Sequence, residues 1–71
     1  MNQRARGEAV APLLNETTAA EILRVSRRTL ADWRRRGVGP GFVRIGKRLV
    51  RYSRADIDAF VVAGRRETRH E

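Results

Sequence analysis

The sequence is interrupted near its middle by Gly37-Val38-Gly39-Pro40-Gly41, a segment that cannot continue a helix. Three glycines and a proline in five residues predict a turn-forming loop. The chain has 71 residues, which is enough for one small domain and not for two. The segments on either side of the loop must therefore share a single core. Their patterns differ, because helical signals come before the loop and β-prone runs come after it.

Two short helices are predicted before the loop. Asn15 is a favourable N-cap for the first, with Glu16 in the first turn, and Thr18 with Glu21 is an alternative capping box. This helix ends near Arg24. Its buried stripe consists of Ala19, Ala20, Ile22 and Leu23.

The second helix is predicted over residues 27–36, after a tight turn. Ser26 is its N-cap, and Gly37 ends it. Leu30 and Trp33 form a thin core face, while most of the other positions carry Arg. A turn of about three residues between two helices is typical of a helix-turn-helix.

A β-hairpin is predicted after the loop, from two β-prone runs over residues 42–45 and 48–52. A two-residue turn pairs Ile45 with Arg48, whereas a three-residue turn pairs Ile45 with Leu49. Both registers are compatible with the sequence. A hairpin with a cationic tip beside a basic helix is the wing of a winged helix.

A third helix is predicted after the hairpin, with Ser53 and Asp56 as a capping pair and Gly64 at its end. The predicted fold class is α+β, a winged helix-turn-helix with a C-terminal helix. The predicted core consists of Leu14, Ala20, Leu23, Val25, Leu30, Trp33, one face of the hairpin, Ile57, Phe60 and Val61. The predicted organisation is a flexible arm (residues 1–12), the winged domain (residues 13–64) and a charged flexible tail (residues 65–71).

Positive charge is concentrated in the middle of the chain. The sequence has 16 Lys and Arg against eight Asp and Glu, a net charge of +8. From Arg24 to Arg54 there are 11 basic residues and one acid, Asp32, so this stretch carries +10. A merely solvated surface usually mixes both signs, so the concentration favours a polyanionic partner. Arg supplies 15 of the 16 cations, and its planar fork suits phosphates and guanine edges.

Other classes of protein are disfavoured by the composition. The chain has no Cys and a single His, His70, which excludes a disulfide scaffold, a Cys-ligated zinc site and a His cluster. No apolar run approaches the roughly 20 residues of a membrane span, and the first ten residues do not resemble a signal peptide. No nucleophile–base pair is visible. We therefore expect a cytoplasmic protein that has no metal or cofactor and is not an enzyme.

The motifs of these predicted elements, taken together, match a known pattern. They are Ala19-Ala20-Glu21-Ile22-Leu23, Val25-Ser26-Arg27-Arg28-Thr29-Leu30, Trp33-Arg34-Arg35 followed by Gly37, Arg44-Ile45-Gly46-Lys47-Arg48 and Ala55-Asp56-Ile57-Asp58-Ala59-Phe60. Over about residues 13–63 the sequence resembles the small excisionase-like winged helix-turn-helix proteins, relatives of the MerR DNA-binding domain. It departs from that pattern at Arg24, where members commonly have Gly, and in a second strand that is one residue longer than usual.

The resemblance implies a phage or prophage excisionase, also called a recombination directionality factor, in the cytoplasm and nucleoid of a bacterial host. Such a protein binds repeated sites on double-stranded DNA cooperatively and head to tail, bends the DNA and directs an integrase toward excision. A small AlpA- or MerR-like transcriptional regulator is the alternative on the same fold. An RNA-binding module is a third hypothesis, for which only Phe42 and Tyr52 could supply stacking surfaces.

Two groups of residues are expected to contact DNA. The recognition helix supplies Ser26, Arg27, Arg28, Thr29, Asp32, Arg34 and Arg35, and the wing supplies Arg44, Lys47, Arg48 and Arg51. Arg27 and Arg28 are expected to reach guanine edges or, alternatively, phosphates. Asp32 accepts from a cytosine amine or positions Arg28 or Arg35. The wing tip is expected in an adjacent minor groove or on its phosphates.

Overall fold

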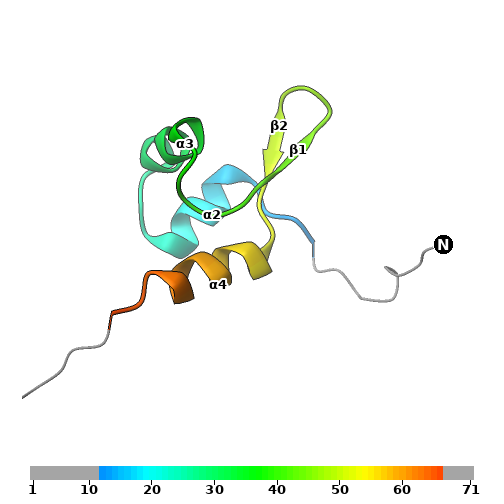
Figure 1. Ribbon diagram of the computed structural model, residues 1–71. Coiled ribbons are helices and arrows are strands. Elements are labelled where there is room, and N and C mark those ends of the chain that lie inside the picture. Colours follow the sequence, from blue (N-terminus) through cyan, green and yellow to red (C-terminus); the bar gives the residue numbers. More distant parts are fainter. Residues whose placement is uncertain (1–11, 67–71) are drawn as a thin grey trace, which may run out of the picture.

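The computed structural model describes residues 12–66, so the predicted arm up to residue 11 and the tail from residue 67 lie outside the described residues. Its elements are α2 (Glu16–Leu23), α3 (Arg27–Arg36), β1 (Val43–Ile45), β2 (Leu49–Arg51) and α4 (Arg54–Ala63), in that order. The hairpin projects from the helices beside α3, and α4 lies on the opposite side of α2 from it (Figure 1). The predicted winged helix-turn-helix is confirmed.

All three helices begin at a side-chain cap. Asn15, Ser26 and Ser53 each accept a hydrogen bond from the backbone N–H three residues further along, at 2.9, 2.9 and 3.0 Å. Each bond satisfies a donor that the first turn of a helix leaves free. The predicted caps are confirmed, and Asn15 rather than Thr18 is the cap of α2.

Left-handed residues end the first two helices. Gly37 ends α3 with φ 76° and ψ 21°, and Arg24 ends α2 with φ 62° and ψ 40°. Arg24 therefore adopts the turn geometry expected of a glycine. Its backbone N–H donates to the carbonyls of Ala20 and Glu21, while its side chain is exposed. A residue with a Cβ is strained in this conformation, at a cost of about 1–2 kcal/mol.

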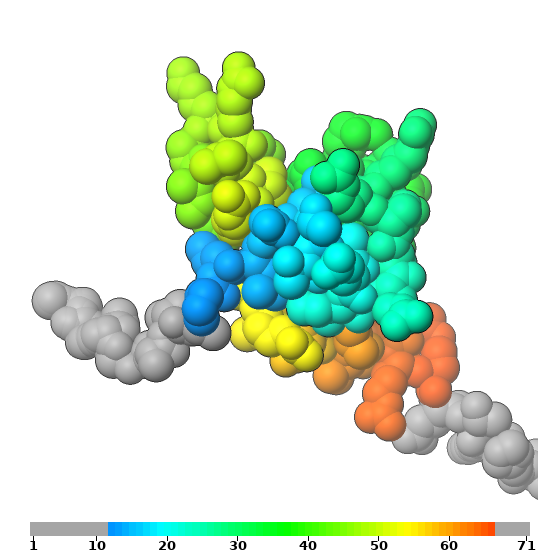
Figure 2. Space-filling model, turned by 180° about the vertical axis from the view of Figure 1, so that it is seen from behind, coloured from blue at the N-terminus to red at the C-terminus, as the bar shows by residue number. Residues whose placement is uncertain are grey.

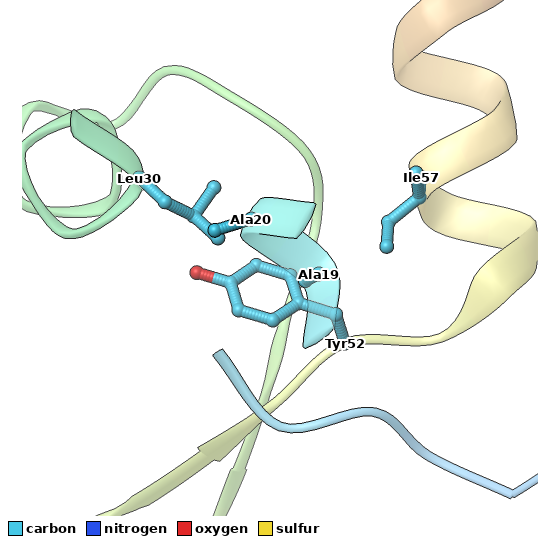
Figure 3. Close-up of a cluster of buried hydrophobic side chains, with 5 residues drawn as sticks. All are labelled: Ala19, Ala20, Leu30, Tyr52 and Ile57. Carbon is cyan, nitrogen blue, oxygen red and sulfur yellow. The ribbon is translucent and has the colours of Figure 1, made fainter. Parts of the chain in front are cut away.

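A small core holds the elements together. It consists of Ala19, Ala20, Leu30, Tyr52 and Ile57, all at most 3% exposed (Figure 3). The two alanines of α2 lie between Leu30 of α3 and Ile57 of α4. Their small side chains allow both neighbouring helices to approach α2 closely.

The predicted core is wrong at Val61, which is 51% exposed. Tyr52, at the end of the second β-prone run, is 1% exposed and belongs to the core. Val61 follows Ile57 by one helical turn, and the core reaches along α4 only as far as Phe60, whose ring lies 5.5 Å from that of Trp33. The predicted place of one face of the hairpin in the core is also only partly right, since Val50 packs against the core while Val43, Ile45 and Leu49 remain exposed.

The wing has a three-residue turn. Its pairs are Val43 with Arg51, Arg44 with Val50 and Ile45 with Leu49, which decides between the two predicted registers. Beyond the hairpin, Leu14 and Tyr52 exchange two backbone hydrogen bonds of 2.8 Å. The base of the wing is thereby joined to the segment that enters α2.

Candidate nucleic-acid interface

The start of α3 presents exposed cations. Arg27 and Arg28 follow the Ser26 cap directly, and both side chains are exposed while Leu30 faces the core. The Ser26 hydroxyl also lies 3.0 Å from Thr29 Oγ1 and can donate to it. Thr29 then keeps its own hydroxyl hydrogen for another acceptor. This end of the helix can donate to bases and phosphates from side chains and backbone alike.

Asp32 and Arg35 form an ion pair on the exposed side of α3. Their side chains are 47% and 69% exposed, so water screens the pair. The structure thus shows the predicted contact of Asp32 with Arg35, whereas a contact of either residue with a base stays a prediction.

Arg34 takes an inward position that the sequence reading did not foresee. Its side chain is 19% exposed, and Nη1 lies 2.5 Å from Glu16 Oε2 and 3.1 Å from the Tyr52 hydroxyl. The hydrogen bond with Glu16 raises the pKa of the guanidinium above its ordinary value. Arg34 therefore connects α3 to the start of α2 and to the end of the wing. Its spacing of four from Leu30 places it on the core side of the helix, which was the available sequence signal.

The wing carries the remaining predicted contacts. Lys47 and Arg48 lie in the exposed turn, and Arg44 is exposed with its guanidinium carbon 5.7 Å from the centre of the Phe42 ring. Arg51 is half-buried and donates to the Val50 carbonyl at 2.8 Å. The tip of the wing thus presents two cations, while Arg44 and Arg51 lie on its two strands.

Most of the cations in the basic stretch remain unpaired. Three of its 11 Lys and Arg form ion pairs, namely Arg34, Arg35 and Arg54. The others have no carboxylate partner among residues 12–66, and they are Arg24, Arg27, Arg28, Arg36, Arg44, Lys47, Arg48 and Arg51. Positive charge is therefore left uncompensated on α3 and on the wing.

A groove of about 310 Å³ separates α3 from the wing. It is visible from behind as the hollow between the yellow-green hairpin and the green helix, above the start of α2 (Figure 2). Its lining residues are Asn15, Glu16, Thr17, Arg27, Arg34, Arg48, Leu49, Val50 and Arg51. The predicted residues Arg27, Arg34, Arg48 and Arg51 are brought together here, whereas Arg28 and Lys47 lie outside the groove.

Residues 12–66 offer neither a candidate metal site nor a candidate membrane span. That part of the chain holds no group of three or more His, Cys, Asp or Glu that could bind a metal ion. None of its helices is both long and apolar enough to cross a membrane.

Comparison with known proteins agrees with this geometry. Residues 13–64 match the family model described as a helix-turn-helix domain. A search of curated proteins found no match to the chain. The matched segment contains the capped helix pair, the wing and α4, which together form a DNA-binding architecture. The chain therefore belongs to the helix-turn-helix domain family, which contains small excisionase- and AlpA-like proteins.

Proposed function

We propose that this protein binds a specific sequence of double-stranded DNA, with α3 in the major groove and the wing on the adjacent backbone or minor groove. The supporting observation is that unpaired cations lie on both elements, while Arg34 and Tyr52 hold the two elements in a fixed relation. A helix and a wing on one rigid frame suit two neighbouring grooves of a duplex. The protein acts by binding, without catalysis or a cofactor.

Direct reading of bases falls to Arg28. Its side chain is exposed at the start of α3, where residues of a recognition helix reach base edges, and no ion pair within residues 12–66 engages it. Bidentate donation to the O6 and N7 atoms of a guanine is the contact that suits an Arg there. Neighbouring phosphates are contacted from the helix by Ser26, Thr29 and Arg35. The wing contacts phosphates through Arg44, Lys47, Arg48 and Arg51.

We further propose that the biological role is that of an excisionase in a bacterial host. One domain of this size offers only a small DNA interface, so high specificity requires several copies on repeated sites. Head-to-tail binding of copies, bending of the DNA and recruitment of an integrase belong to this role. The RNA-binding alternative is weaker, because Tyr52, one of its two aromatic candidates, is 1% exposed.

Footprinting on the DNA that flanks the gene tests the binding proposal. We expect regularly repeated protected sites and a slope of log affinity against log salt of about −4 to −6, as roughly five to seven neutralised phosphates predict. Single-stranded RNA should compete poorly. Stronger competition by single-stranded RNA than by the duplex would contradict the proposal.

An in vitro excision reaction with the cognate integrase tests the biological role. Stimulation of excision is expected from an excisionase. Binding to attachment-site DNA without any change in excision would instead favour a small AlpA- or MerR-like transcriptional regulator.

A further inference from the structure

We propose that the groove between α3 and the wing is a clamp for a single phosphodiester of the DNA strand that runs from the major groove to the wing. This inference rests on the proposed function and assigns a ligand to a part of that surface. In this arrangement Arg27 contacts the DNA backbone, whereas Arg28 contacts a base.

The cations of the groove come from two separate elements. Arg27 and Arg34 line it from α3, while Arg48 and Arg51 line it from the wing. Arg27 Nη1 lies 3.5 Å from the Thr17 hydroxyl, and Arg51 is bonded to the Val50 carbonyl at 2.8 Å. These bonds hold two guanidinium groups at the groove, which lowers the entropy lost when they bind an anion.

The balance of charge in the groove favours an anion. Among residues 12–66, Glu16 is its one acidic lining residue, and that carboxylate already accepts a hydrogen bond from Arg34 at 2.5 Å. Arg27, Arg48 and Arg51 have no carboxylate partner within residues 12–66, so they leave the groove with an excess of three positive charges. Guanidinium groups bind phosphate oxygens by charge-assisted, bidentate hydrogen bonds.

The shape and lining of the groove favour a backbone phosphate over a small molecule. Its volume of about 310 Å³ is at the lower limit for ligand pockets, which are lined mainly by apolar and aromatic side chains. Within the described part of the chain, Leu49 and Val50 are the only apolar lining residues. The groove is open between α3 and the wing (Figure 2), where a strand contacted by both elements must pass.

A pair of double variants tests the clamp. Two cations that hold one phosphate should together account for one phosphate contact, so Arg27→Gln/Arg51→Gln should reduce the steepness of the salt dependence by about 0.9. Arg44→Gln/Lys47→Gln removes the same charge, but both Arg44 and Lys47 are wing cations outside the groove. This matched variant should reduce the steepness by about 1.8, because two separate phosphates are lost.

The measurement is the affinity for a fluorescein-labelled duplex that carries a footprinted site, by anisotropy at several salt concentrations. The wild type should bind more weakly to a duplex with one neutral methylphosphonate at the clamped linkage than to the unmodified duplex. The affinity of Arg27→Gln/Arg51→Gln should be the same for both duplexes. Equal loss of steepness in the two double variants, when circular dichroism shows both folded, would overturn the clamp alone. Failure of the wild type to bind any duplex would overturn the proposed function.

Discussion

Arg34 and Glu16 are separated by 18 residues in the sequence, and their side chains form an ion pair of 2.5 Å between α3 and the first turn of α2. The same guanidinium nitrogen also lies 3.1 Å from the hydroxyl of Tyr52. A single cation within the basic stretch therefore stabilises the arrangement of the helices and the wing. Its exposed neighbours on α3 remain available to DNA.

The first prediction concerns this ion pair. Arg34→Gln should lower the free energy of unfolding by about 1–2 kcal/mol, since it leaves a half-buried carboxylate without its cation. Arg35→Gln removes the same charge from the exposed pair with Asp32 and should cost less than about 0.5 kcal/mol. Urea denaturation followed by Trp33 fluorescence measures both. Equal losses would show that burial of the Arg34 pair has no effect on stability.

The second prediction concerns the strained end of α2. Arg24→Gly should raise the free energy of unfolding by about 1 kcal/mol relative to Arg24→Ala, because a glycine adopts φ 62° without a clash of its Cβ. Both variants remove the same charge, so their difference isolates the backbone strain. Thermal unfolding by circular dichroism is the measurement. If Arg24→Ala equals or exceeds Arg24→Gly in stability, Arg24 is not strained.

The third prediction compares two glycines with positive φ. A Cβ on Gly39 would lie 3.0 Å from the Cβ of Trp33, whereas a Cβ on Gly46 would meet no atom within 4 Å. Gly39→Ala should therefore cost about 2–3 kcal/mol from strain and overpacking, and Gly46→Ala about 1 kcal/mol from strain alone. Denaturation midpoints give the order of the two variants, and a reversed order would contradict this account of the loop.

The fourth prediction separates reading from positioning at the DNA. Arg28→Ala should reduce the preference for the footprinted site over a scrambled duplex by about 1–3 kcal/mol. Lys47→Ala should weaken binding to both duplexes about equally and flatten the salt dependence. Competition binding with the two duplexes is the measurement. An unchanged preference in Arg28→Ala would assign the base contact to another residue.

The helix boundaries could be predicted because the signals for them are local. The cap of α3 depends on Ser26 and a backbone donor three residues away, and its end on Gly37, so both are contained in one short run of sequence. The turn at Arg24 is local as well, because it lies between the end of α2 and the start of α3 only three residues later.

The inward side of the site could not be predicted from local patterns. The position of Arg34 depends on Glu16 and Tyr52, each 18 residues away, and Tyr52 is polar enough to pass for a surface residue. The register of the wing likewise depended on a choice between two turn lengths that the strand residues fit equally well. The position of Arg34 is therefore set by residues distant in sequence, and the register of the wing by a turn length that the local sequence leaves open.

The two backbone hydrogen bonds between Leu14 and Tyr52 close the chain into a loop that contains α2, α3 and both strands of the wing. Since Tyr52 is a core residue and Leu14 packs against the same cluster, opening of these bonds disturbs the packing at the core. We therefore expect the wing to open together with the helices, and the two amide protons to be among the slowest in the domain to exchange with water.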